Sequence, residues 1–111
     1  MRIINLNQLD ITKAHNEVKR KAIIKVGDLK SKIQTINEAW LDPNEGFSPH
    51  THTDCEEIYF IQEGAGALTI DDQIYQIKKG DWIVIEQNEA HSMKNTSQTD
   101  PLKYISIRTL I

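Results

Sequence analysis

Two histidines separated by one residue, His50 and His52, have the spacing of a chemical site. On a helix their side chains would point about 200° apart, whereas on a strand they share one face, about 6.7 Å apart. Pro49 before them and the β-branched Thr51 between them favour extended backbone. Two imidazoles on one strand face can converge on one ion, so this stretch predicts half of a metal site.

A carboxylate is expected to complete the site, because a divalent ion bound by neutral imidazoles gains charge attraction from an acid. Asp54, Glu56 and Glu57 follow the histidines directly. If Glu57 points inward on the next strand, Tyr59 does too, while Glu56 faces the opposite side. We therefore predict Glu57 as the ligand and interpret Asp54 and Glu56 as bystanders.

The single cysteine, Cys55, lies among these acids and could be a thiolate ligand or form a cross-link. We expect it in a bend and unreactive, since lone thiols are inert outside an electropositive setting. One cysteine makes no internal disulfide, and the N-terminus lacks the apolar region and cleavage site of a secretory signal, so we predict a cytoplasmic protein. No apolar run approaches the ~20 residues of a membrane helix.

The chain has 111 residues, which suits one domain spanning 1–111. Its formal charge of -3 offers no broad basic surface for nucleic acid. The one basic cluster, 19–21, lacks interleaved aromatics and is interpreted as a solvated face.

From residue 20 onward, short segments rich in Ile, Val, Thr, Tyr and Trp alternate with turn residues, which is typical of an all-β sandwich or barrel. Segment 1–19 is weakly patterned and could hold an edge strand or one turn of helix. The expected strands include 21–26, 32–41, 57–61, 67–70, 75–77, 82–85, 91–94 and 103–110.

Two of these strands are apolar at successive positions instead of alternating, at 58–61 and 82–85. Alternation is expected where one face meets water, so both of their faces should be covered. With no helix available as cover, a second subunit packed sheet to sheet is the expected partner, and the pattern predicts a homodimer.

The stretch HTHTDCEEIYFIQEG resembles the first conserved motif of the cupin superfamily: His, any residue, His, three or four residues, Glu, six residues, Gly. The residues that meet it are His50, His52, Glu57 and Gly64. The stretch GDWIVIEQNEAHSMKN resembles the second cupin motif. The matching residues are Gly80, His91 and Asn95.

Three positions depart from the family pattern. Glu86 replaces a proline, and Asn44 and Asn88 replace glycines. After glycine, asparagine best tolerates left-handed backbone, so the turns should be preserved.

The resemblance implies a double-stranded β-helix, or jelly roll, of two antiparallel sheets, with a divalent metal held by His50, His52, Glu57 and His91. Three histidines and one glutamate leave about two positions of a six-coordinate ion open to water, dioxygen or a bidentate molecule. The ligand types suit Fe, Mn, Ni, Zn or Co. The alternative is a barrel without metal whose histidines are only hydrogen-bonded; the fourth histidine, His15, is interpreted as a surface residue.

The resemblance further implies either a metalloenzyme acting on a small oxygen-bearing molecule, dioxygenase-like or isomerase-like, or a module that binds or senses a sugar or small acid without turnover. Without a second acid/base pair in the expected interior, oxygen chemistry is slightly favoured. Side chains that could act beside the metal are Tyr59, Trp40, Phe47, Met93 and Arg108; for the aromatics and Met93 the alternative is barrel core or dimer interface.

Overall fold

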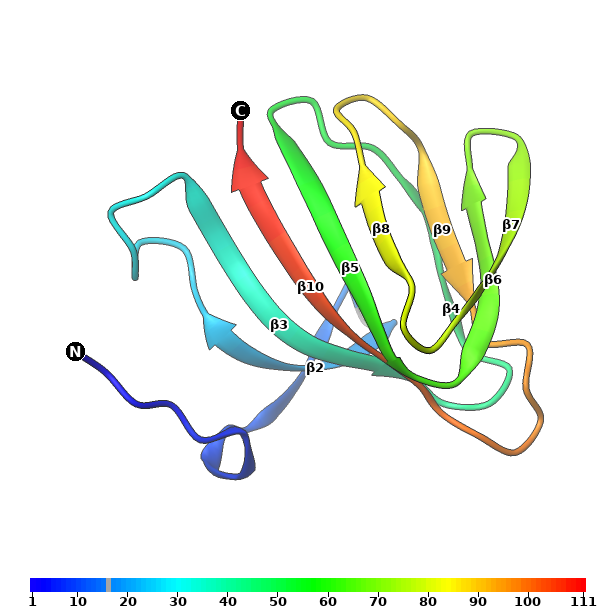
Figure 1. The fold of residues 1–111 in the computed structure, drawn as a ribbon, viewed down its shortest axis with the longest axis horizontal. Helices are drawn as coiled ribbons and strands as arrows, with labels where there is room; N and C mark the ends of the chain where they lie inside the picture. The colour runs from blue at the N-terminus through cyan, green and yellow to red at the C-terminus, as the bar shows by residue number, and fades with distance from the viewer. Residues whose placement is uncertain (16) are drawn as a thin grey trace.

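The computed structural model describes residues 1–15 and 17–111, which form ten strands in two antiparallel sheets (Figure 1). The strands are β1 (Ile11–Ala14), β2 (Val18–Ile24), β3 (Ile33–Leu41), β4 (Gly46–His50), β5 (Cys55–Glu63), β6 (Ala65–Ile70), β7 (Gln73–Lys78), β8 (Trp82–Ile85), β9 (His91–Lys94) and β10 (Leu102–Leu110). One sheet has the order β1-β2-β3-β10-β5-β8 and the other β4-β9-β6-β7. The expected all-β jelly roll is confirmed.

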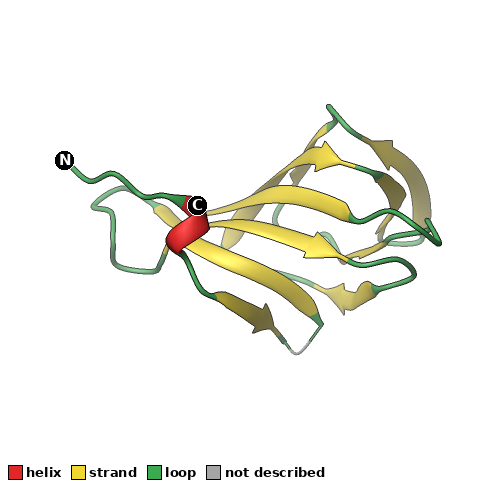
Figure 2. Cartoon of the chain, turned by 90° about the horizontal axis from the view of Figure 1, so that it is seen from below, coloured by secondary structure: helices red, strands yellow, loops and turns green. Residues whose placement is uncertain are grey.

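The weakly patterned N-terminal segment contains both structures that the sequence left open. Leu6–Gln8 is a single 3₁₀ turn, and β1 is an edge strand paired with β2. Figure 2 shows the turn and the N-terminus outside the space between the two sheets. Within the described ranges, no helix reaches the length and hydropathy that a membrane crossing needs.

The core lies between the sheets and follows the two-residue period of the strands. Along β5, Cys55, Glu57, Tyr59 and Ile61 are buried, while the residues between them are only partly so. This confirms that Glu57 and Tyr59 share the inner face and that Glu56 does not. The placement of Cys55 in a bend is wrong, because β5 begins at Cys55 and its side chain is 2% exposed.

Two turns carry the asparagines that replace family glycines. Asn44 has φ 65° and Asn88 has φ 69°, so both adopt the left-handed backbone expected of them. The glycine of the first motif, Gly64, has φ +83°, and a Cβ there would lie 2.3 Å from the Pro101 carbonyl oxygen. Both the backbone conformation and the close approach require glycine at this turn.

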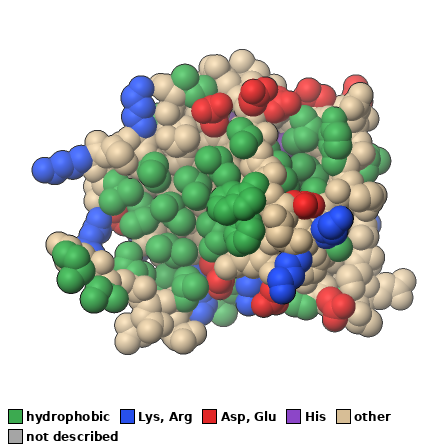
Figure 3. Space-filling view, in the orientation of Figure 1, with side chains coloured by type: hydrophobic (Ala, Val, Ile, Leu, Met, Phe, Trp, Pro, Cys, Tyr) green, Lys and Arg blue, Asp and Glu red, His purple; other side chains and the backbone are tan. Residues whose placement is uncertain are grey.

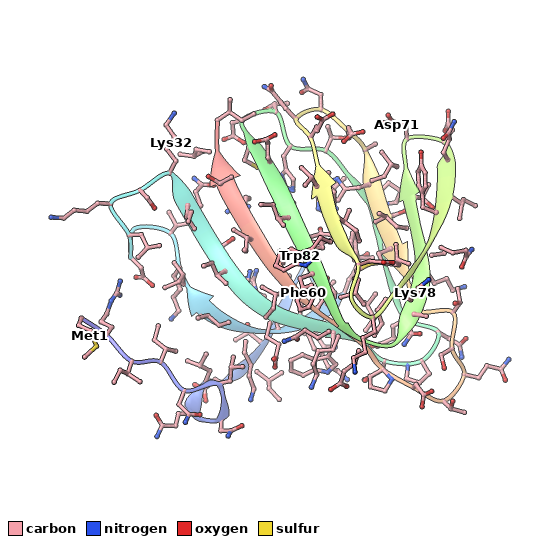
Figure 4. The ribbon with its side chains drawn as sticks, in the orientation of Figure 1. Met1, Lys32, Phe60, Asp71, Lys78 and Trp82 are labelled. Atoms are coloured by element: carbon pink, nitrogen blue, oxygen red, sulfur yellow. The ribbon has the colours of Figure 1, made fainter. Side chains whose placement is uncertain are left out.

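The outward face of the six-stranded sheet carries two apolar rows that cross neighbouring strands. One row pairs Ile36, Ile107, Ile58 and Val84 in register, and the next pairs Ile105, Phe60 and Trp82. The rings of Phe60 and Trp82 stack at 4.4 Å, and both side chains lie on the face turned to the viewer in Figure 4. Trp82 is 65% exposed and Val84 is 61% exposed. Figure 3 shows the resulting apolar surface, which the chain itself does not cover.

Candidate metal centre

Four side chains converge between the two sheets. Oε1 of Glu57 lies 2.5 Å from Nε2 of His52, 3.4 Å from Nε2 of His91 and 4.0 Å from Nε2 of His50. One ligand atom from each residue lies within 4.8 Å of those of the other three. The structure therefore brings together the four residues that the motifs single out.

Three strands and one loop position these side chains. His50 ends β4 and pairs directly with His91, the first residue of β9, so their ring centroids lie 4.1 Å apart. Glu57 projects from β5 of the other sheet. The strand argument fails for His52, which lies beyond the end of β4; its carbonyl oxygen instead accepts the Asn88 N–H at 2.9 Å. The loop before β9 thus anchors the backbone of His52.

Backbone carbonyls set the tautomers of two of the rings. Nδ1 of His50 lies 3.2 Å from the Ser48 oxygen, and Nδ1 of His91 lies 3.0 Å from the Glu89 oxygen. A carbonyl only accepts, so each Nδ1 donates, and in the neutral ring each Nε2 carries its lone pair toward Glu57. This is the outer-shell arrangement that orients metal-bound histidine.

The buried Nε2 atoms of His52 and His91 make no well-formed hydrogen bond. Their short approaches to Glu57 Oε1 are electrostatic contacts with poor hydrogen-bond geometry. Buried polar atoms without a partner are rare, because each costs about 1–3 kcal/mol. Together with His50, these two nitrogens and the carboxylate suit a divalent transition metal, so the residues present fit the ion that the family pattern implies.

Electrostatics keep the carboxylate ionised. Burial alone would raise the pKa of Glu57, but the contact with His91 and the charges of His52 and His91 outweigh it and leave that pKa lowered. Burial lowers the pKa of His50 and opposes its protonation. For His91, burial acts in the same direction, but its contact with Glu57 prevails and the pKa is raised. One carboxylate and three imidazoles therefore face one point.

Two buried phenols lie on the inner face beside the cluster. Burial raises the pKa of Tyr59 well above its usual value, and burial likewise raises that of Tyr104. The two rings lie 5.1 Å apart, and the Tyr59 ring is 6.5 Å from that of His91. Both hydroxyls stay protonated at neutral pH; that of Tyr59 contacts the Glu57 carboxylate, and that of Tyr104 is available as a hydrogen-bond donor.

A cavity of about 470 Å³ adjoins the four ligands, with His50, His52 and Glu57 in its wall. Of the side chains that the sequence suggested, Phe47, Tyr59 and Arg108 line this cavity. Trp40 and Met93 lie outside it. Met93 is buried in the core, and Trp40 pairs with Lys19 and Lys103 at outward positions of the six-stranded sheet. Met93 is therefore a core residue, as the alternative expected, and Trp40 lies on the outer face of the sheet.

Sequence reasoning missed several residues of the cavity wall. They are Arg20, Thr35, Asn37, Tyr104 and Ser106. For Tyr104 and Ser106 a signal existed, because both share strand parity with Arg108. Arg20 carried no such signal, since its strand was expected to begin after it.

The mouth of the cavity also differs from expectation. His15 is exposed as expected, but it lines the cavity, and its ring centroid lies 6.2 Å from that of His50. The carboxylate of Glu17 accepts hydrogen bonds from the Ser48 N–H at 2.9 Å and from the Ser48 hydroxyl at 2.7 Å. These bonds hold the tip of the β1–β2 hairpin against β4, the strand that carries His50.

The family model of the cupin domain matches residues 38–108 of the chain, a range that holds all four clustered ligands. The chain belongs to the cupin family. Within this cupin, His50, His52, Glu57 and His91 occupy the positions expected from the two motifs, and the cluster is a possible metal site.

Known proteins resemble this cupin to different extents. An uncharacterized protein of Methanocaldococcus jannaschii is 36% identical over 72 residues, which is 65% of this chain and 57% of that protein. The oxalate-binding protein of Thermotoga maritima is 27% identical over 95 residues, covering 86% of this chain and 78% of that protein.

Among solved structures, a predicted oxalate decarboxylase from Thermotoga maritima superposes with a TM-score of 0.91 and 22% identity. The superposition covers 99% of this chain and 100% of that one. It shows that the two proteins share the fold.

Proposed function

We propose that this cupin binds one divalent transition metal through His50, His52, Glu57 and His91 and acts on a small oxygen-bearing molecule in the adjoining cavity. The observation that carries the proposal is the pair of buried, unpartnered Nε2 atoms beside an ionised carboxylate. A closed structural site would not need a cavity of about 470 Å³ in contact with its ligands.

The bound metal would supply Lewis-acid or oxygen chemistry at the positions that its four ligands leave open. The chain's own residues divide the remaining work. Tyr104 offers a protonated hydroxyl to an oxygen of the bound molecule, while the Tyr59 hydroxyl contacts the Glu57 carboxylate. Phe47, buried and in the wall, reduces access of water to the ligands.

Two reactions fit this division, one dioxygenase-like and one isomerase-like. The sequence favoured oxygen chemistry because no further acid/base group was expected inside. With His15 and Glu17 at the cavity mouth, that preference loses its basis. The substrate class is supported only by the similarity to Thermotoga maritima proteins whose names include oxalate, a small acid.

The alternative is a module that holds a sugar or small acid without turnover. Elemental analysis of freshly purified protein, followed by oxygen uptake and product analysis over a panel of small acids and sugars, separates the two functions. Stoichiometric metal with turnover supports the enzyme. Stoichiometric metal with ligand-induced thermal stabilisation and no product supports the binding module, and protein that neither holds nor takes up metal contradicts both.

A second copy of the chain is the proposed partner. An antiparallel sheet leaves one face to water only where that face is polar, whereas here two apolar rows face outward. A two-fold axis places the same patch on both subunits, so the rows of Ile58 and Phe60 would meet their own copies. Charges of both signs flank the rows, with Lys21 paired to Glu38 in register, so opposite charges can face one another across the axis. A cytoplasmic location remains a prediction from the sequence.

A further inference from the structure

Two of the three arginines of the chain, Arg20 on β2 and Arg108 on β10, line the cavity beside the metal centre. Both are partly buried, and the Nε atom of each is buried without a hydrogen-bond partner. In the described part of the chain, neither guanidinium takes part in any hydrogen bond or ion pair between side chains. A guanidinium has five donors, so this lack of protein partners leaves a strong anion-binding capacity in the wall.

Structural arginines are normally paired, because taking a cation out of water costs several kcal/mol unless an anion compensates it. The cross-strand candidate partner is Glu57, which pairs in register with Arg108. Its carboxylate is directed to the three histidines, and no ion pair joins it to Arg108. The other acid in the wall, Glu17, is bound by Ser48 at the mouth.

The charge of the loaded cavity follows from these residues. A divalent ion with the Glu57 carboxylate carries about one net positive charge, and the two arginines add two more. Glu17 removes one of these charges at the mouth. A neutral sugar would leave the excess uncompensated, whereas a dianion would balance it.

The two arginines lie at separate ends of the wall. Arg108 is level with Glu57, whereas Arg20 pairs with Ala39, which pairs with Tyr104. Tyr104 is four residues from Arg108, so the two Cα positions differ by about 13 Å along the strands and about 10 Å across them. Between them lie the polar side chains of Asn37 and Ser106, which also line the cavity. The two backbone positions are therefore about 16 Å apart, a separation that a ligand with an anionic group at each end would span.

Building on the proposed metal function, we propose that the cavity binds a small organic dianion with an anionic group at each end. One carboxylate occupies the metal end beside Arg108, and the second is bound by Arg20. The forked guanidinium matches a planar carboxylate at each end. In this proposal the ligand is a dicarboxylate longer than a two-carbon diacid, so that its two ends reach both arginines.

The test is calorimetric titration of metal-loaded protein with oxalate, malonate, succinate, glutarate and adipate, with butyrate as a monoacid and xylose as a neutral molecule. We expect one of the longer diacids to bind at least tenfold more tightly than butyrate, and xylose to bind more weakly than both. Arg20→Gln should remove the advantage of the diacid while leaving the affinity for butyrate unchanged. Arg108→Gln should weaken diacid and monoacid alike.

Arg2→Gln is the matched control, because Arg2 is exposed and binds only the Asp28 carbonyl oxygen. Arg20→Lys and Arg108→Lys keep the charge and serve as second variants if a glutamine variant fails to fold. The proposal is overturned if Arg20→Gln leaves the diacid-to-monoacid ratio unchanged, or if xylose binds as tightly as the best diacid. Repeating the titrations on protein without metal separates the two proposals. Absence of metal binding rejects the proposed metal function. The effect of Arg20→Gln on diacid binding still decides the dianion proposal.

Discussion

Arg108 and Glu57 are direct partners across β10 and β5, yet their side chains do not pair. The Glu57 carboxylate lies instead within 4.0 Å of three imidazole nitrogens, and the arginine lines the cavity. A buried carboxylate that faces three imidazoles and does not pair with the adjacent cation lies where a metal ion would compensate it. The same relationship leaves Arg108 available to an anionic ligand.

Removing one imidazole should release the metal. We expect His52→Ala to lower the affinity for a divalent transition metal by at least about 100-fold, since ligands contribute more than the outer-shell partners that cost 10–100-fold. The metal content after gel filtration and the fall in melting temperature caused by a chelator should both decrease, because bound metal stabilises only the folded state. His15→Ala is the matched control and should keep both. Full metal content in His52→Ala would contradict the assignment.

Two glycines with the same backbone conformation should respond differently to alanine. Gly27 has φ +92° with nothing within 4 Å of an added Cβ, so Gly27→Ala should cost about 1–2 kcal/mol from the left-handed backbone alone. Gly64 has φ +83°, and the Cβ would lie 2.3 Å from the Pro101 oxygen. Gly64→Ala should therefore lower the free energy of unfolding by at least about 3 kcal/mol. Denaturant titration measures both values, and equal losses would show that the close approach relaxes freely.

Asn95 is predicted to be a structural residue. Its side chain is fully buried, and Nδ2 donates to the Leu41 oxygen at 3.0 Å and to the Asp100 oxygen at 2.8 Å, while Oδ1 accepts the Ser97 N–H at 3.0 Å. Asn95→Ala should cost about 3 kcal/mol in unfolding free energy, because it leaves buried backbone groups unpaired. Asn95→Asp keeps the acceptor but places a carboxylate against two carbonyls, so it should cost at least as much. Thr96→Ala, at an exposed neighbour, should change little.

A charge on the outer apolar rows should disrupt the proposed dimer. Val84 lies in one of these rows and is 61% exposed in the single chain, so Val84→Glu would bury a charge between two sheets. We expect wild-type protein to sediment as a dimer at micromolar concentration and Val84→Glu as a monomer. Ile74, 68% exposed on β7 and outside the rows, provides the control Ile74→Glu, which should remain dimeric. A monomeric wild type would reject the partner proposal.

Local patterns in the chain were sufficient for much of the site. The two-residue period of strands placed Glu57 and Tyr59 inward, because a pleated backbone directs alternate side chains to one face. The left-handed turns at Asn44 and Asn88 followed from residue type, since asparagine tolerates positive φ. The motif spacing named the four ligands without any knowledge of their distances.

Other features depended on where strands end and which strands pair across the sheets. His52 lies beyond β4 and is held by a backbone bond from Asn88, a contact between residues distant in sequence. Cys55 proved to be the first residue of β5 because its pairing with Leu110 extends the strand.

The N-terminal residues depended on the tertiary structure most of all. The composition of segment 1–19 gave no pattern for its role. The pairing of β1 with β2 and the bonds from Ser48 to Glu17 place His15 at the cavity mouth. Arg20 reaches the cavity wall because β2 pairs with β3 beside β10. The sequence by itself determined the fold class and the ligand types, through local backbone preferences and strand periodicity. Tertiary packing alone decided which cations remain without partners beside the metal centre, because it pairs strands from distant parts of the chain.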